Sequence, residues 1–251
     1  MLQNYKNISL LLLIIIFSSC TTVRVIHQDV QITGTVYNID TSIVNDLKMN
    51  QLVNTYKMDV DSIMNHPLGI SAQPLTKAQP DCTLGHLVSD ALLEAAKEKD
   101  SLVQVAVSNQ GGIRINYLSP GMITLGNLYE IMPFDNMLVV IEVPGAIMME
   151  WCQHIANKGG WPVSNISFDI DSSSAINIII NKKPINELLV YRVATSDYIA
   201  NGGDGCEFLR GCKRYTYNVL MRDAMIQYVS HHTAEGKELN IQLENRIKYA
   251  E

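Results

Sequence analysis

Apolar residues recur at helical spacing in two stretches of the first half of the chain. Over residues 40–64 they return every three or four positions, and the same spacing begins again at Thr83 and stops at the charged run 97–100. We therefore expect a long first helix within residues 40–66 and a second helix that starts near Thr83. Glycine and prolines interrupt residues 67–80, which favours an extended connector between the two helices.

Further along, the pattern changes to short apolar or β-branched runs that alternate with helical spacing. Pro144 is suited to the first position of a helix, and the turn 181–184 suggests a hairpin between the runs on either side of it. The predicted strands are 102–107, 137–143, 163–170, 175–180, 188–195 and 241–249, and the predicted helices follow Pro144 and cover 219–229. This mixture predicts an α+β domain with helices packed on the faces of a mixed sheet.

The N-terminus has the pattern of an export sequence. One charge, Lys6, precedes a wholly apolar run over residues 10–17, which is far shorter than the ~20 residues that a membrane span needs. Ser18, Ser19 and Cys20 follow and resemble the cleavage box of bacterial lipoproteins. We expect a signal peptide over 1–19, lipid on Cys20, a tether over 20–39 and one domain over 40–251. A short uncleaved anchor with an incidental cysteine is the alternative.

Charge and cysteine content limit the classes of function. Loss of residues 1–19 would remove Lys6 and change the net charge from −6 to −7, so general attraction to nucleic acid is not expected and any anion site must be local. Beyond Cys20 there are four cysteines, Cys82, Cys152, Cys206 and Cys212. The last two are close enough in sequence to form a disulfide, and free, partly buried thiols are an equal alternative.

A glycine-rich loop follows the predicted strand 188–195. Its Gly202, Gly203 and Gly205 surround Asp204. Glycines permit positive φ and close backbone approach, so the loop can fold tightly while Asp204 accepts hydrogen bonds, for instance from paired ribose hydroxyls. An ordinary glycine turn with a solvated aspartate is the alternative.

A second loop, residues 109–114, follows the predicted strand 102–107. It combines Asn109, Gly111, Gly112 and Arg114. The guanidinium could hold a phosphate and the amide could pair with a base edge or a sugar. A surface salt bridge for Arg114 and a turn-forming role for Asn109 are the alternatives.

Two aromatic residues, Phe134 and Tyr198, lie in polar loops that are expected to turn. Pro133 should end a short helix and place Phe134 in a turn. Two rings offered from loops could clamp a planar base, and such stacking contributes ~1–3 kcal/mol per base. Burial in the core is the ordinary alternative for an aromatic ring.

These loops together resemble a known family. Asn-x-Gly-Gly-Ile-Arg (109–114), Leu-Tyr-Glu-x-x-Pro-Phe (128–134) and Asn-Gly-Gly-Asp-Gly (201–205) are similar to motifs in the C-terminal domain of the 5′-nucleotidase and UDP-sugar hydrolase family, as is the helix start at 83–91. The resemblance spans roughly residues 40–248. It implies a substrate-specificity domain in which two aromatics sandwich the base.

The resemblance also implies a role for each matching residue. Phe134 and Tyr198 would form the sandwich, Asp204 would bind ribose, Asn109 would make polar contacts and Arg114 would lie on the phosphate side. Tyr198 stands where the family usually has Phe. A further family arginine is replaced here by Ala78, next to Lys77.

Members of that family carry a metallophosphoesterase domain with Asp-x-His and Asn-His-Asp/Glu motifs, and neither motif occurs in this sequence. The histidines give no metal site by pattern: His86 and His154 lie in predicted helices, and His231 and His232 end one. We therefore expect no catalytic residue, metal or cofactor in this chain.

The expected function is nucleotide recognition for a separately encoded metallophosphoesterase that holds a divalent metal pair. A stand-alone nucleotide or nucleoside receptor is the alternative, and a scaffold without ligand is a third. No nucleophile motif favours serine or cysteine catalysis.

Overall fold

The computed structural model describes residues 34–37, 40, 43–44 and 46–250. The predicted signal peptide 1–19, Cys20 and most of the tether 20–39 lie outside them. Chain contacts divide the protein into Met1–Leu47 and Lys48–Glu251, and the second unit holds the elements that follow, apart from the first residue of α2. Among the described residues, no helix combines the length and the apolar character that crossing a membrane requires.

The predicted first helix is shorter than expected at its start. α2 covers Leu47–Met64, and none of its residues is buried. The predicted second helix, α3, covers Thr83–Lys99, and it is buried on nearly all sides over residues 84–96. Cys82 caps α3, because its sulfur accepts a hydrogen bond from the Gly85 N–H at 3.3 Å. Lys97 and Lys99 in the last turn complement the helix dipole.

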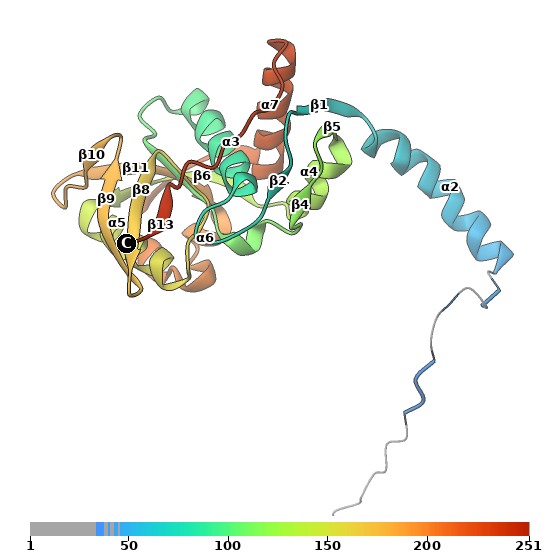
Figure 1. The fold of residues 1–251 in the computed structure, drawn as a ribbon, viewed down its shortest axis with the longest axis horizontal. Coiled ribbons are helices and arrows are strands. Elements are labelled where there is room, and N and C mark those ends of the chain that lie inside the picture. The colour runs from blue at the N-terminus through green and yellow to red at the C-terminus, as the bar shows by residue number, and fades with distance from the viewer. Residues whose placement is uncertain (1–33, 38–39, 41–42, 45, 251) are drawn as a thin grey trace, which may run out of the picture. The chain divides into compact units, whose positions relative to one another are not determined.

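The described residues form two larger sheets and two short antiparallel pairs (Figure 1). A five-stranded sheet has the order β12-β6-β11-β3-β7, and a four-stranded sheet has the order β10-β9-β8-β13. β11 pairs in parallel with β3, β13 pairs in parallel with β8, and the other pairs are antiparallel. The strands of the five-stranded sheet are β3 (Val105–Val107), β6 (Met137–Pro144), β7 (Val163–Ser164), β11 (Val190–Ser196) and β12 (Lys213–Leu220).

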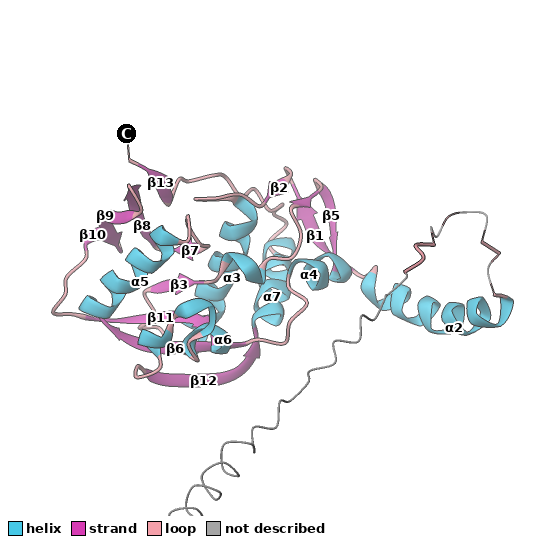
Figure 2. Ribbon diagram, turned by 90° about the horizontal axis from the view of Figure 1, so that it is seen from below, coloured by secondary structure: helices cyan, strands magenta, loops and turns pink. Residues whose placement is uncertain are grey.

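The remaining strands and helices lie around the five-stranded sheet (Figure 2). The four-stranded sheet is formed by β8 (Ile166–Asp171), β9 (Ser174–Ile180), β10 (Lys183–Pro184) and β13 (Ile247–Tyr249). The short pairs are β1 (Pro67–Ser71) with β5 (Gly121–Thr124) and β2 (Leu75–Thr76) with β4 (Tyr117–Leu118). The helices are α4 (Leu125–Ile131), α5 (Gly145–Asn157), α6 (Asp197–Ala200) and α7 (Met221–Ala234), with 3₁₀ turns at Gln110–Gly112, Gly203–Gly205 and Glu207–Leu209.

The five-stranded sheet separates two hydrophobic cores. Leu138 and Val140 of β6 pack in the core that contains α3, α4 and α7. Their neighbours Val139 and Ile141 pack in the other core, with α5 and the four-stranded sheet. This alternation is what a strand buried on both faces produces, because successive side chains point to opposite sides. The predicted α+β class, a mixed sheet with helices packed on its faces, is confirmed.

Several strand predictions are corrected. The predicted strand 163–170 is divided into β7 and β8, which belong to different sheets. The turn at 181–184 does not join 175–180 to 188–195: β9 pairs with β8 and β10, and β11 inserts between β6 and β3 in the other sheet. The predicted strands 102–107 and 241–249 are reduced to β3 and β13. β12 was not predicted. β3 and β13 are shorter than β11 and β8, the strands they pair with in parallel, so the length of an apolar run does not by itself fix the length of the paired strand.

Candidate nucleotide-binding cavity

The five side chains expected to bind a nucleotide line one cavity of about 330 Å³. This volume lies within the ~300–1,000 Å³ range of small-molecule sites. The full lining comprises Asn109, Gly111, Gly112, Arg114, Phe134, Asn136, Tyr198 and Asp204. Of these, Asn136 was not singled out from the sequence, although it lies two residues after Phe134.

The sheet topology explains why three loops distant in sequence meet. β3 and β11 are parallel neighbours, so the loops that leave Val107 and Ser196 lie at the same edge of the sheet. β6 is antiparallel to β11, with Leu138 opposite Ser196, so the segment that enters β6 lies at that edge too. Each loop contributes at least one of the five residues.

Asp204 is the polar centre of the cavity. Its Oδ2 accepts a hydrogen bond from Asn109 Nδ2 at 2.7 Å, and its Oδ1 accepts one from the Tyr198 hydroxyl at 2.8 Å. The Asp204 N–H in turn donates to that hydroxyl at 3.2 Å. A carboxylate has about four acceptor positions, so both oxygens keep capacity for ligand hydroxyls while their orientation is fixed.

The glycine-rich loop has the backbone that the sequence suggested. Gly202 and Gly205 have φ of 91° and 88°, and Asp204 itself lies in the left-handed region at 52°. Position 203 requires a glycine for a different reason: an added Cβ would lie 2.5 Å from the Tyr198 ring. Asp204 is exposed to solvent, as the ordinary alternative expects, but it is also hydrogen-bonded to two side chains of the cavity, Asn109 and Tyr198.

Neither aromatic ring of the cavity is buried. Phe134 is 47% exposed and Tyr198 is 44% exposed. The Arg114 guanidinium lies 5.5 Å from the centre of the Phe134 ring and donates to the Gly111 carbonyl at 3.4 Å. Arg114 makes no ion pair with any described residue, so the salt-bridge alternative is wrong. The cavity thus offers two exposed ring faces, one guanidinium and one carboxylate.

The hydrogen bond to Asp204 also affects the titration of Tyr198. It raises the pKa of the Tyr198 hydroxyl above the ordinary tyrosine value, with partial burial as a smaller cause. A negative carboxylate next to the hydroxyl favours the protonated form. Tyr198 therefore remains a hydrogen-bond donor throughout the neutral range.

Arg222 supports the Phe134 loop and was missed from the sequence. It lies on α7, almost fully buried, and its Nη1 donates to the carbonyls of Met132 and Pro133 at 3.3 and 3.2 Å. Its Nη2 pairs with Asp135 at 2.6 Å, and its guanidinium lies 3.9 Å from the centre of the Tyr129 ring. Arg222 thus binds the backbone before Phe134 and the side chain of the residue after it.

Lys77 lies beside the second loop rather than in the cavity lining. Its ammonium donates to the Ile113 carbonyl at 2.7 Å, one residue before Arg114. Gln110 donates from its side chain to the carbonyl of Ala78 at 2.9 Å. The connector 67–80 therefore holds the backbone of the loop 109–114.

The four cysteines beyond Cys20 are free thiols in the structure, so Cys206 and Cys212 form no disulfide. Burial raises the pKa of Cys152 and of Cys206 to about 12 each. A thiol with such a pKa is not a thiolate at neutral pH, which argues against a cysteine nucleophile at either position.

The histidines occupy different environments. His86 is fully buried, and its Nε2 lies 2.8 Å from Asp81, which is a packing role. His154 lies behind the cavity, with Nε2 3.0 Å from the Asp204 carbonyl. His231 contacts Glu94 of α3, a partner 137 positions away that the sequence pattern did not indicate.

The chain matches the family model of the 5′-nucleotidase C-terminal domain over residues 62–211. It is 25% identical over 234 residues to the cell wall protein Lmo0130 of Listeria monocytogenes, covering 83% of this chain and 30% of that protein. It is 23% identical over 250 residues to the 5′-nucleotidase of Mus musculus, covering 84% and 42%. A 5′-nucleotidase precursor from Thermus thermophilus superposes with a TM-score of 0.70 at 25% identity, covering 81% and 43%.

The chain spans less than half the length of each of these relatives. What it shares with them is the fold around the cavity, and the family model extends from the end of α2 to just beyond the last 3₁₀ turn. Because that model covers more than half of the residues, the chain belongs to the 5′-nucleotidase C-terminal domain family.

Proposed function

We propose that this chain recognises the nucleoside part of a nucleotide and that a separately encoded metallophosphoesterase carries out the hydrolysis. The observation that carries the proposal is the meeting of Phe134, Tyr198 and Asp204 in one cavity of ligand size. Two exposed rings suit a planar base, and an oriented carboxylate suits the two hydroxyls of ribose.

The two remaining side chains fit the same ligand. Asn109 bonds to Asp204 through one N–H and keeps its other N–H and its oxygen for a ligand. Arg114 lies at the Phe134 side, where its guanidinium could pair with a phosphate. In this proposal both residues orient the nucleotide and none of the five performs a chemical step.

The proposal of a second chain rests on the motifs of the sequence. The 251 residues contain neither Asp-x-His nor Asn-His followed by an acidic residue. Such motifs hold the divalent metal pair that would activate water and polarise the phosphorus. We propose that this metal pair belongs to the partner chain, together with the nucleophile that it activates.

We further propose that the chain is exported and held at a bacterial membrane by lipid on Cys20. The apolar run 10–17 and the small residues before Cys20 support this, and one relative is named as a cell wall protein. Labelling with a radioactive fatty acid tests it: the wild-type chain should incorporate label and Cys20→Ser should not. Equal labelling of both proteins would refute lipid attachment at Cys20.

Calorimetric titration of the full chain in detergent with AMP and UMP tests recognition. Phe134→Ala and Tyr198→Ala should each weaken binding by ~1–3 kcal/mol, because each removes one stacking face. Binding that is unchanged in both variants, or absent in the wild type, would refute nucleotide recognition in this cavity.

A phosphate-release assay tests the second chain. Hydrolysis of AMP with a divalent metal should require both this chain and a metallophosphoesterase encoded beside it. Binding without any effect of this chain on the rate would instead establish a stand-alone nucleotide receptor.

A further inference from the structure

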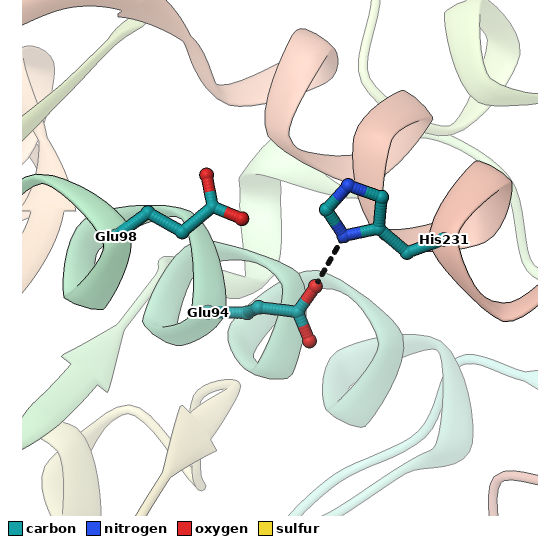
Figure 3. Close-up of side chains that lie close together, drawn as sticks. All are labelled: Glu94, Glu98 and His231. Carbon is teal, nitrogen blue, oxygen red and sulfur yellow. Dashed lines mark hydrogen bonds and ion pairs between the residues drawn. The ribbon is translucent and has the colours of Figure 1, made fainter.

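Two carboxylates and one imidazole converge on the side of the molecule formed by α3 and α7. Glu94 and Glu98 lie one turn apart on α3, and His231 faces them from α7 (Figure 3). One potential ligand atom from each side chain lies within 4.8 Å of the other two. We propose that these residues form a binding site for one divalent transition-metal ion, of which zinc is the best match.

The donor set determines which metal fits. Mg²⁺ and Ca²⁺ prefer sites made only of oxygen ligands, whereas an imidazole nitrogen beside carboxylates suits zinc and its neighbours in the first transition row. Three protein ligands leave a fourth tetrahedral position for water. The sequence alone indicates only a helix-end role for His231, because its partners on α3 are brought to it by the folding of the chain.

The spacing of two of the three ligand atoms is already close to that of a bound state. The His231 Nδ1 lies 3.2 Å from Glu94 Oε1. Zinc-to-ligand distances of about 2.0–2.1 Å at a tetrahedral angle place two ligand atoms about 3.3 Å apart. A metal ion could therefore replace the proton shared between these two atoms, and the ligand atom of Glu98, within 4.8 Å of both, would approach to complete the site.

Glu98 has a partner that orients it without blocking it. Gln227 of α7 donates to Glu98 Oε2 at 2.7 Å, which leaves Oε1 free to bind the metal. Outer contacts of this kind fix the direction of a ligand and tune its affinity. α3 thus supplies the ligands Glu94 and Glu98, and α7 supplies the ligand His231 and the orienting residue Gln227.

The charges around the cluster also favour a cation. Asp90, one turn before Glu94, is neutralised by Arg246 through two hydrogen bonds of 2.7 and 2.8 Å. Among the described residues, no lysine or arginine forms an ion pair with Glu94 or Glu98. Two neighbouring carboxylates without a permanent cation repel each other, and a dication between them removes that repulsion.

The cluster is accessible to a metal ion from solvent. Glu94 and Glu98 line an open cavity of about 570 Å³ together with Asp90, Lys97 and Tyr228. The cavity is large enough to hold the water molecule at the fourth coordination position of the metal. A bound metal would join α3 to α7, so it should raise the thermal stability of the chain, as any ligand of the native state does.

Calorimetry of the full chain in detergent, purified without a histidine tag, tests the site. Zinc chloride should bind one ion per chain, and magnesium and calcium chloride should give no saturable binding. Glu94→Gln and His231→Gln should each weaken zinc binding by more than the ~10–100-fold that loss of an outer partner costs, and Gln227→Leu should fall within that range.

His232→Gln is the matched control. Its imidazole lies on the same helix, but its Nδ1 bonds to the Tyr228 carbonyl at 3.0 Å and not to α3. This variant should bind zinc like the wild type. All replaced side chains are at the surface or partly exposed, and circular dichroism verifies that each variant is folded.

Cobalt absorption is a second measurement, and it reports the coordination geometry of the bound ion instead of its affinity. Co²⁺ bound to a nitrogen and two carboxylates in tetrahedral geometry should give strong visible absorption in the wild type, and the absorption should disappear in His231→Gln. The proposal is overturned if the wild type binds no zinc, or if Glu94→Gln and His231→Gln bind it as tightly as His232→Gln does. Nucleotide binding is not involved in either readout, so this outcome is independent of the proposed function.

Discussion

The two rings of the cavity are held in position by different means. Tyr198 is held within its own loop: its hydroxyl bonds to Asp204, six residues later, and its ring packs on the backbone at Gly203. Phe134 depends on Arg222, which reaches its loop from α7, almost 90 residues further along the chain. One side of the cavity is therefore formed by local sequence, and the other is formed by the packing of a distant helix.

Substitutions on the two sides of the cavity should therefore have different effects on ligand affinity and on stability. Changes in the glycine-rich loop should alter ligand affinity directly, because ring and carboxylate share one short segment. Changes at Arg222 should reduce stability as well as affinity, because its guanidinium is buried between α7 and the loop. The predictions below test this contrast, from the largest expected effect on nucleotide affinity to the smallest.

Gly203→Val should produce the largest loss. A Cβ at this position would lie 2.5 Å from the Tyr198 ring. Because the ring is rigid, the whole side chain of Tyr198 would have to move to relieve this contact. The displaced ring should lose its stacking and its bond to Asp204, at a combined ~2–4 kcal/mol in binding free energy. Calorimetric titration with AMP measures the loss.

Gly211→Ala is the control for this change, since an added Cβ there meets no atom within 4 Å and the residue has no positive φ. It should bind AMP like the wild type. Wild-type affinity in a folded Gly203→Val protein would show that the Tyr198 ring does not contact the ligand.

Arg222→Ala should lower both stability and affinity. It removes the hydrogen bonds to two loop carbonyls and the pair with Asp135, so the free energy of unfolding should fall by ~1.5–3 kcal/mol. Binding should weaken by no more than the ~1–3 kcal/mol that loss of Phe134 itself costs. Thermal unfolding and calorimetry measure the two effects separately.

A double variant tests whether Arg222 acts through Phe134. If it does, adding Arg222→Ala to Phe134→Ala should weaken AMP binding no further than Phe134→Ala alone. Losses that add in full would mean that Arg222 affects the ligand by another route.

Tyr198→Phe should have a smaller effect that depends on the sugar. The ring and its stacking remain, while the hydroxyl that orients Asp204 is lost. Binding of a ribonucleoside should weaken by ~0.5–1.5 kcal/mol. A nucleoside that lacks both ribose hydroxyls should bind the variant and the wild type equally, and an equal loss for both ligands would argue against a sugar-binding role of Asp204.

The smallest effect should be a change with pH. The hydrogen bond to Asp204 raises the pKa of Tyr198 above its unfolded value of about 10. The protonated hydroxyl therefore orients Asp204 fully below about pH 10, and this hydrogen bond is lost as the pH rises through the pKa of the folded state. Nucleotide affinity should therefore be constant from neutral pH to about pH 10 and fall above it. Tyrosinate absorbance follows the same titration, and Tyr198→Phe should abolish the fall in affinity.

The local elements of the fold were predictable where a pattern is long or has a cap. The helix that became α3, the strand that became β6 and the start of α5 after Pro144 were predicted close to their observed bounds. The pairing of strands was not predictable in the same way. β11 and β9 both have buried apolar positions, and nothing in their own residues indicates that they join different sheets.

The same division applies to the cavity. Asp204, the glycines and Tyr198 were found because they are adjacent in sequence and their residue types are unusual together. Asn136 was missed although it lies near Phe134, because an asparagine in a turn has an ordinary local explanation. Arg222 and the pairing of His231 with Glu94 were missed because their partners lie far away along the chain.

The sequence by itself determined the class of fold, the three loops and the residue types that they present, since backbone conformation and periodicity are local properties. The tertiary structure decided that the loops meet. β3 and β11 pair in parallel and β6 runs antiparallel to them, which brings Asn109, Phe134 and Asp204 to one edge of one sheet. It also decided that α3 and α7 pack together, because only burial of their apolar faces in a common core selects one partner among many possible helices.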